Sequence, residues 1–163
     1  MPTLNAPIPV LRSRAWCGAP GCWARFRRSR LAAMATELTR FPIHLGRAGS
    51  AVVQPEHTGD MGWYEGYGQR HGADGIEGRL VAMHTFDAPW ASWEVHPNGA
   101  EIVLCTAGEI TLIQEIDGKH QRTILRPGQF AINDPGVWHT ADVSKSATAV
   151  FITSGEGTDH RPR

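Results

Sequence analysis

Alternation of apolar and polar residues with a period of two recurs over the second half of this 163-residue chain. Successive side chains of a β-strand point to opposite faces, so this alternation predicts strands with one buried face. Turns containing Gly or Pro bound the runs, and Asp117-Gly118 between two of them is a typical hairpin turn. The predicted strands cover residues 78–86, 91–96, 101–107, 110–116, 121–125, 130–133, 137–143 and 147–153.

Many short strands at regular spacing indicate an all-β sandwich or barrel. The length, with 41% hydrophobic and 20% charged residues, suits one domain with a sizeable core. No apolar run of membrane-spanning length occurs, and three Cys do not make a disulfide scaffold. The net charge of zero argues against a dedicated nucleic-acid binder. Residues 41–77 are less regular, and we expect one or two further strands there.

Residues 1–36 differ from the rest because they hold six Arg and no acidic residue. Two interpretations stay open: an organellar transit segment, or an extension upstream of a start near Met34, which we favour. In either case we expect a disordered leader outside the fold. Its Cys17 and Cys22 have no further zinc ligands nearby. We expect the protein to be cytoplasmic, with organellar targeting left open by the leader.

Four residues that bear metal-ligand side chains are expected to converge. Glu94 and His96 lie two apart on a predicted strand and therefore share a face. A turn then reverses the chain so that Glu101 can face the same space, and His139 ends the segment 128–139. Two imidazoles with one or two carboxylates are ligands for a divalent metal such as Fe, Mn, Zn or Ni.

These residues resemble the cupin superfamily. Its first motif is G-x5-H-x-H-x(3,4)-E-x6-G, and its second is G-x5-P-x-G-x2-H-x3-N. The positions that keep the motif spacing are His96, Glu101 and Gly108 in the first and Gly128, Gly136 and His139 in the second. The resemblance covers roughly residues 78–153 and implies an antiparallel jelly-roll β-barrel over residues 37–155. Residues 156–163 either fold back over a mouth of the barrel or trail from it as a C-terminal tail, and we favour the tail.

The motif departs from the family pattern in ways that bear on the metal. The resemblance implies that His96, Glu101 and His139 bind metal, with Glu94 where the family has its first His. Ala88 also replaces a Gly, and Val143 replaces the final Asn. A carboxylate in place of an imidazole favours harder metals such as Mn or Fe(II), or it removes the metal site altogether. Other roles open to Glu94 are a catalytic acid or base and a partner of the ligands.

Two functions remain open. One is a metal-dependent enzyme, an oxygenase or an isomerase/lyase, that acts on a small organic molecule. The other is a non-catalytic module that binds or senses a small ligand. By strand parity, Trp90 and Cys105 are candidates for the substrate pocket, with a buried, inert thiol as the default interpretation of Cys105. We also expect a homodimer formed through open sheet edges, and neither a nucleic-acid nor a membrane partner.

Overall fold

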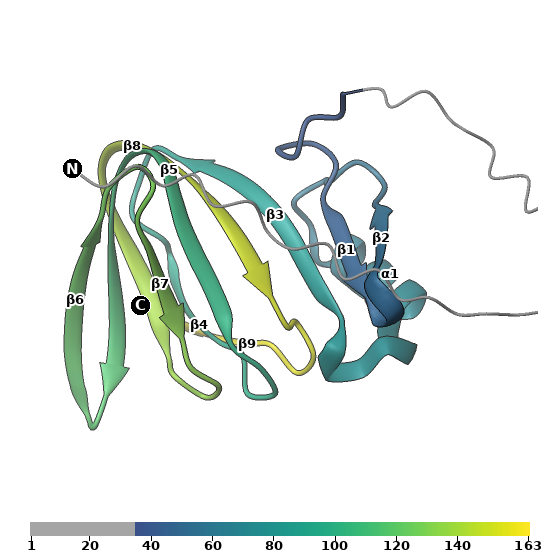
Figure 1. The fold of residues 1–163 in the computed structure, drawn as a ribbon. Coiled ribbons are helices and arrows are strands. Elements are labelled where there is room, and N and C mark those ends of the chain that lie inside the picture. Colours follow the sequence, from purple (N-terminus) through teal and green to yellow (C-terminus); the bar gives the residue numbers. More distant parts are fainter. Residues whose placement is uncertain (1–34) are drawn as a thin grey trace, which may run out of the picture. The chain divides into compact units, whose positions relative to one another are not determined.

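The computed structural model describes residues 35–163 (Figure 1), so the predicted leader lies outside the described residues except for Ala35 and Thr36. None of the helices in this part is long and apolar enough to cross a membrane. The strands are β1 (Ile43–Gly46), β2 (Ser50–Val53), β3 (Arg79–Phe86), β4 (Ser92–Val95), β5 (Glu101–Ile116), β6 (Lys119–Leu125), β7 (Phe130–Asn133), β8 (His139–Thr153) and β9 (Asp159–Pro162). The helical elements are α1 (Met61–His71) and the short 3-10 turns η1 (Arg47–Gly49) and η2 (Gly72–Glu77).

The predicted antiparallel β architecture is confirmed. Within residues 35–163 the strands form one nine-stranded sheet in which every pairing is antiparallel. The long strands β5 and β8 pair with each other from Glu101↔Thr153 to Gln114↔His139. β3 pairs with residues 147–153 of β8, and β4 pairs with His139 at the other end of β8.

β5 is a single bent strand where the alternation predicts two. Register shifts against β8 occur between Cys105 and Ala107 and again after Gly108. A straight strand would separate Glu101 from Gln114 by about 43 Å. Instead, the side chain of Gln114 donates a hydrogen bond of 2.7 Å to Asn133, which is the cross-strand partner of Glu101. The two halves of the strand therefore face each other across the interior.

Apolar side chains from both halves of β5 and β8 fill the space between them. Residues 137–143 and 147–153, predicted as separate strands, are largely the two halves of β8. The buried cluster consists of Val103, Cys105, Ile110, Leu112, Leu125, Ala141, Val143, Ala147, Ala149 and Phe151. This packing holds the bent sheet closed, because burying apolar area stabilises the fold by about 25 cal/mol per Å².

Residues 41–77 contain the two strands β1 and β2, as predicted, and the helix α1, which the sequence analysis missed. Asp60 caps this helix, since its carboxylate accepts a hydrogen bond of 3.0 Å from the backbone N–H of Trp63. Three internal Gly give α1 poor helix propensity, and its pattern is only weakly amphipathic. Tertiary packing of the buried Trp63 side chain fixes the helix instead.

The prediction that the C-terminal residues trail free is wrong. Residues 159–162 form β9, which pairs with β4 from Ser92↔Pro162 to Val95↔Asp159. The short segment lacks a clear alternation of its own, but the edge of β4 supplies unpaired backbone groups that a further strand satisfies. At the far end of the sheet order, β2 is an exposed edge strand. The homodimer expected from open edges stays a prediction.

We expect Gly108→Ala to weaken the bend of β5 severely. Gly108 has φ +71°, and an added Cβ would lie 2.1 Å from the carbonyl oxygen of Ser146. The left-handed conformation costs about 1–2 kcal/mol, and forcing apart packed atoms costs about 1–3 kcal/mol more. Urea denaturation should therefore show a loss of about 2–5 kcal/mol in the free energy of unfolding.

Gly128→Ala is the matched control for this prediction. Gly128 has φ +86°, but no atom lies within 4 Å of the place an added Cβ would take. Only the conformational cost applies, so the loss should be about 1–2 kcal/mol. Equal losses in the two variants would contradict the close approach of β5 and β8 at the bend.

Candidate metal centre

Three structural elements bring the predicted ligands to one place. Glu94 on β4 is the cross-strand partner of His139 at the start of β8. His96 follows β4 two residues later on the same face as Glu94. Glu101 opens β5 and reaches the group from across the interior, because the bend of β5 brings the two layers together.

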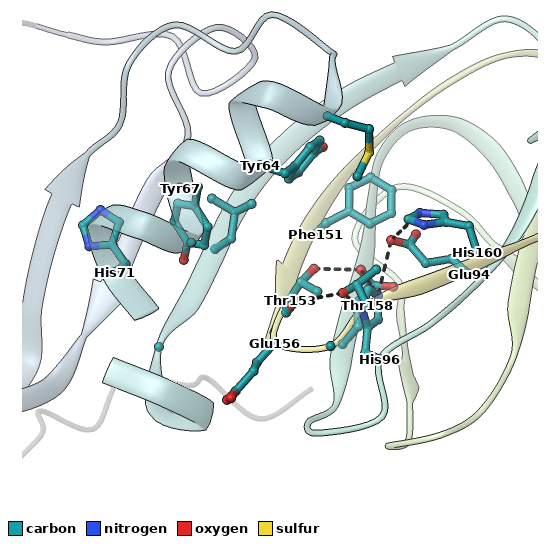
Figure 2. Close-up of a pocket in the computed structure, with 18 of the residues that line it drawn as sticks. Tyr64, Tyr67, His71, Glu94, His96, Phe151, Thr153, Glu156, Thr158 and His160 are labelled. Carbon is teal, nitrogen blue, oxygen red and sulfur yellow. Dashed lines mark hydrogen bonds and ion pairs between the residues drawn. The ribbon is translucent and has the colours of Figure 1, made fainter. Parts of the chain in front are cut away.

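The side chains meet at close range (Figure 2). The Nε2 atom of His96 lies 3.3 Å from Oε1 of Glu101, and the Nε2 atom of His139 lies 3.1 Å from Oε2 of Glu101. These three side chains are at most 3% exposed. Ligand atoms of Glu94, His96 and His139 lie within 4.8 Å of one another, which makes the group a candidate metal site.

Hydrogen bonds at the Nδ1 atoms determine the tautomers of both imidazoles. The Nδ1 atom of His139 lies 3.0 Å from the carbonyl oxygen of Val137, which can only accept, so Nδ1 carries the proton. The Nδ1 atom of His96 lies 2.8 Å from the hydroxyl of Thr158, which donates its own proton to the carbonyl of Gly155. His96 therefore also donates from Nδ1, and both neutral rings direct an Nε2 lone pair inward.

The inward Nε2 atoms of His96 and His139 are buried and lack a hydrogen-bond partner among residues 35–163, although each lies within ion-pair distance of Glu101. A lone pair that faces a carboxylate at this distance is unfavourable unless a cation or a proton lies between them. This donor set fits a divalent metal, which prefers neutral imidazole together with carboxylate oxygen.

Without a metal, a proton takes the place of the cation. Burial disfavours the charged form of His139, but the neighbouring Glu101 outweighs it and raises the pKa of the imidazole. Burial likewise opposes the charge on Glu101, but His139 and His96 outweigh it and hold the pKa of the carboxyl group well below its usual value. A metal and a proton would therefore compete for the same lone pairs.

Two polar side chains hold Glu101 in place. Asn133 donates a hydrogen bond of 3.0 Å to Oε2, and the hydroxyl of Thr153 donates one of 2.7 Å to Oε1. Each carboxylate oxygen has two lone pairs and keeps one for a cation. The orientation of Glu101 is thus fixed by the protein before any ligand arrives.

Glu94 differs from Glu101 in its surroundings. Its Oε1 atom lies 3.8 Å from His96 and 3.4 Å from His160 on β9, and its side chain is 26% exposed. Burial raises the pKa of Glu94, and the negative charge of Glu101 adds to the increase. The two carboxyl groups thus have pKa values shifted in opposite directions, an arrangement that suits one for charge and the other for proton transfer.

Three of the four side chains, those of Glu94, His96 and Glu101, line a cavity of about 630 Å³. This volume is within the usual range of about 300–1,000 Å³ for small-molecule sites. Aromatic side chains make up much of the wall between its ends, including Phe86, Trp90 and Phe151. The helix α1 contributes Tyr64 and Tyr67, which Figure 2 shows across the cavity from Glu94.

Residues 83–158 match the Cupin_2 family, described as the cupin domain. The chain carries a cupin domain. The fold predicted from the two motifs is thereby established, together with the position of the candidate metal site inside it. No curated protein gives a significant match to this sequence.

Several solved structures resemble parts of the cupin domain. Hydroquinone 1,2-dioxygenase from Sphingomonas sp. TTNP3 is 17% identical over 46% of this chain, with a TM-score of 0.40. The chain covers 59% of that enzyme's length. A cupin-2 domain containing protein from Shewanella frigidimarina is 16% identical over 52% of this chain and 71% of its own, with a TM-score of 0.40. A double-stranded β-helix protein from Klebsiella pneumoniae is 23% identical over 52% of this chain and 76% of its own, with a TM-score of 0.44.

The cupin domain places the two predicted pocket residues differently. Trp90 lines the cavity, and its ring lies 6.3 Å from that of His139. Cys105 has the parity expected for an inward residue, but it lies four residues along β5 from Glu101, about 13 Å farther from the site. It is fully buried in the apolar cluster, where its thiol contacts the carbonyl oxygen of Ala107. The expectation that Cys105 lines the pocket is therefore corrected.

Thr158 and His160 belong to the site but were not predicted. Both lie in the segment that was expected to trail, and both line the cavity. Pairing of β9 with β4 puts His160 opposite Glu94. The sequence of β9 has no apolar alternation that would predict this pairing. The strand pairs with the backbone at the edge of β4 and does not bury an apolar face of its own.

We expect Thr158→Val to lower metal affinity by about 10- to 100-fold, because a ligating imidazole depends on the partner of its second nitrogen. The substitution keeps the volume of the side chain but removes the acceptor for Nδ1 of His96. Competition with a chromophoric chelator, with Zn²⁺ as the metal, measures the change. Thr85→Val is the control, since the hydroxyl of Thr85 bonds that of Thr148 on the surface, away from the site. Unchanged affinity in Thr158→Val would contradict the proposed tautomer of His96.

Proposed function

We propose that this protein is a divalent-metal-dependent enzyme that acts on a small organic molecule, as an oxygenase or an isomerase/lyase. The observation that carries the proposal is the pair of buried Nε2 lone pairs of His96 and His139, which converge on Glu101 and have no hydrogen-bond partner in the described part of the chain. A site built only for stability would satisfy these atoms with protein donors. The adjoining cavity offers room for a small substrate.

The ligands proposed for the metal are His96, His139 and Glu101, with Glu94 beside them. Two carboxylates and two neutral imidazoles would balance the charge of a divalent cation. The extra carboxylate favours Fe(II) or Mn(II) over softer metals. Once bound, the metal would polarise an oxygen of the substrate or, as Fe(II), supply redox chemistry.

The protein itself would orient the substrate and move a proton. Glu94 is the proposed acid or base, because its raised pKa lets the carboxyl group hold a proton that Glu101 cannot hold. Its neighbour His160 reaches solvent, with 46% of its side chain exposed, and gives the proton a route out of the cavity. The aromatic wall around Trp90 would exclude water from the reacting group.

A non-catalytic module that binds or senses a small ligand is the second candidate. The observation that favours it is Glu94 itself, which stands where the resemblance implies a ligating His and lies nearer to His160 than to His96. In that case the proton between Glu101 and His139 would take the place of the metal permanently.

Elemental analysis of the purified full-length chain separates the two candidates. The enzyme proposal predicts about one Fe or Mn per chain, as expected for a single site. His139→Ala should lose this metal, whereas His84→Gln, which lines the same cavity outside the cluster, should retain it. A metal-free wild-type protein, or full occupancy in His139→Ala, would refute the proposed metal enzyme.

We expect Glu94→His to change the metal preference of the site. An imidazole in place of the carboxylate removes one negative charge and adds a softer ligand, which favours Ni²⁺ and Zn²⁺ over Mn²⁺. The ratio of Zn²⁺ to Mn²⁺ affinity should rise by about tenfold or more in competition titrations. The same ratio in the variant and the wild type would show that Glu94 does not take part in binding the metal.

A further inference from the structure

A second cluster of polar side chains lies away from the metal centre, and its members His44 and Tyr67 line the same cavity. His44 on β1 is 2% exposed, with Nδ1 2.7 Å from the hydroxyl of Tyr67 and Nε2 2.8 Å from Oδ2 of Asp74. Tyr67 lies on α1, and Asp74 lies in η2. All three residues precede the matched cupin domain, so the cluster is an addition to that domain.

The carboxylate of Asp74 fixes the direction of the hydrogen bonds. Because a carboxylate only accepts, neutral His44 carries its proton on Nε2 and presents a lone pair at Nδ1. The hydroxyl of Tyr67 therefore donates to His44 and leaves its own oxygen lone pair free to accept. Burial, together with the charge of Asp74, raises the pKa of Tyr67 to about 12, so the phenol keeps this proton.

Neighbouring rings hold the cluster rigid. The ring of His71 stacks on that of His44 at 3.8 Å, and its Nε2 atom lies 2.9 Å from Oε1 of Gln54. The ring of Trp63 lies parallel to that of Tyr67, with 5.9 Å between centroids. A donor or acceptor fixed in this way binds a ligand with little loss of side-chain entropy.

The strand register gives the separation between this cluster and the metal centre. One row of cross-strand partners runs from His44 to Leu80, then to Thr153, and then to Glu101. Three steps between neighbouring strands place the backbones of His44 and Glu101 about 14 Å apart along the sheet. A ligand that contacts both polar ends must therefore bridge a distance of this order.

Apolar groups separate the two polar ends. Leu80, Ala82 and Phe151 line the cavity between them. Figure 2 shows Tyr67 and His71 on one side, His96 and Glu94 on the other, and Phe151 between. A ligand that satisfies this cavity is flat and apolar in the middle and polar at each end.

We propose that Tyr67, positioned by His44 and Asp74, is a hydroxyl-binding site for an aromatic ligand that carries an oxygen-bearing group at one end and a hydroxyl at the other. The oxygen-bearing end would lie at the metal centre, and this placement rests on the proposed function. The placement of the hydroxyl end rests on the Tyr67 contacts alone. The ligand hydroxyl would donate to Tyr67, whose oxygen is left as an acceptor.

Binding of 4-hydroxycinnamate and cinnamate to the full-length chain tests this inference. The two acids differ only in the hydroxyl group, and calorimetric titration gives the affinity of each. Wild-type protein should bind the hydroxylated acid about tenfold more tightly, as expected for one net hydrogen bond. Tyr67→Phe should lose this preference and retain its affinity for cinnamate.

Tyr64→Phe is the matched control, because Tyr64 also lies on α1 and lines the cavity, but its hydroxyl lies 3.1 Å from His57 instead of His44. This variant should keep the preference. Titrations with Zn²⁺ and after chelation separate the inference from the proposed function. A preference that persists without metal supports the Tyr67 site even where the metal enzyme fails.

Asp74→Asn provides a test that leaves Tyr67 intact. The amide can donate to Nε2 of His44, which moves the ring proton to Nδ1 and turns the Tyr67 hydroxyl toward the cavity as a donor. The ratio of 4-methoxycinnamate to 4-hydroxycinnamate affinity should then rise by about threefold or more, since the methoxy oxygen only accepts. If Asp74 served only to hold α1 in place, the substitution would leave this ratio of affinities unchanged.

Three results would overturn the inference. They are the absence of a hydroxyl preference in the wild type, its survival in Tyr67→Phe, and failure of both acids to bind at about 10 mM, the range of the weakest specific ligands. Circular dichroism of each variant checks that it is folded. If Tyr67→Phe does not fold, the Asp74→Asn ratio decides.

Discussion

The bend of β5 at Gly108 is the constraint on which the site depends. It folds a 16-residue strand back over itself and brings Glu101 within reach of His139, which otherwise belongs to the opposite end of the β5–β8 ladder. The bend requires a left-handed backbone at position 108 and a close approach to Ser146 that leaves no room for a side chain. Gly108 meets both conditions because it has no Cβ. The ligand cluster is thus a consequence of sheet curvature rather than of neighbouring positions in the sequence.

Burial then gives the cluster its chemistry. Asn133 and Thr153 hold Glu101, while Val137 and Thr158 hold the outer nitrogens of the two imidazoles. These bonds leave the Nε2 lone pairs of both imidazoles, and one lone pair of each Glu101 oxygen, directed inward. At the protein surface, water would donate hydrogen bonds to these lone pairs. In the buried site a cation is needed to stabilise them.

The cavity has a second polar end because the chain before the cupin domain adds β1 and α1. The same row of cross-strand partners that contains Glu101 reaches His44 three strands away. Sheet geometry thereby sets the distance between the two ends. The aromatic and aliphatic wall between them, which includes Leu80 and Phe151, excludes a uniformly polar ligand.

Much of the fold could be predicted from the sequence, because alternation and turn residues are local signals. Predicted strand 130–133 agrees with β7 at both ends. The spacing of His96, Glu101 and His139 gave the candidate site through its resemblance to the cupin motifs. Local patterns cannot show that two runs form one bent strand, nor that an edge recruits β9.

The other parts of the cavity lie beyond sequence patterns for similar physical reasons. The Gly residues of α1 hide a helix that tertiary packing stabilises. Parity placed Cys105 on the inward face but carried no information about depth along the strand. His44 and Asp74 lie 30 residues apart and match no motif, so only the fold brings them together.

Anomalous diffraction from crystals of the full-length protein grown with Mn²⁺ tests the central claim most directly. The account predicts one strong peak about 2.0–2.3 Å from the Nε2 atoms of both His96 and His139. It also predicts that both Nδ1 atoms keep their present partners. A cluster without a peak, with His139 bonded to Glu101 through a proton, would contradict the account.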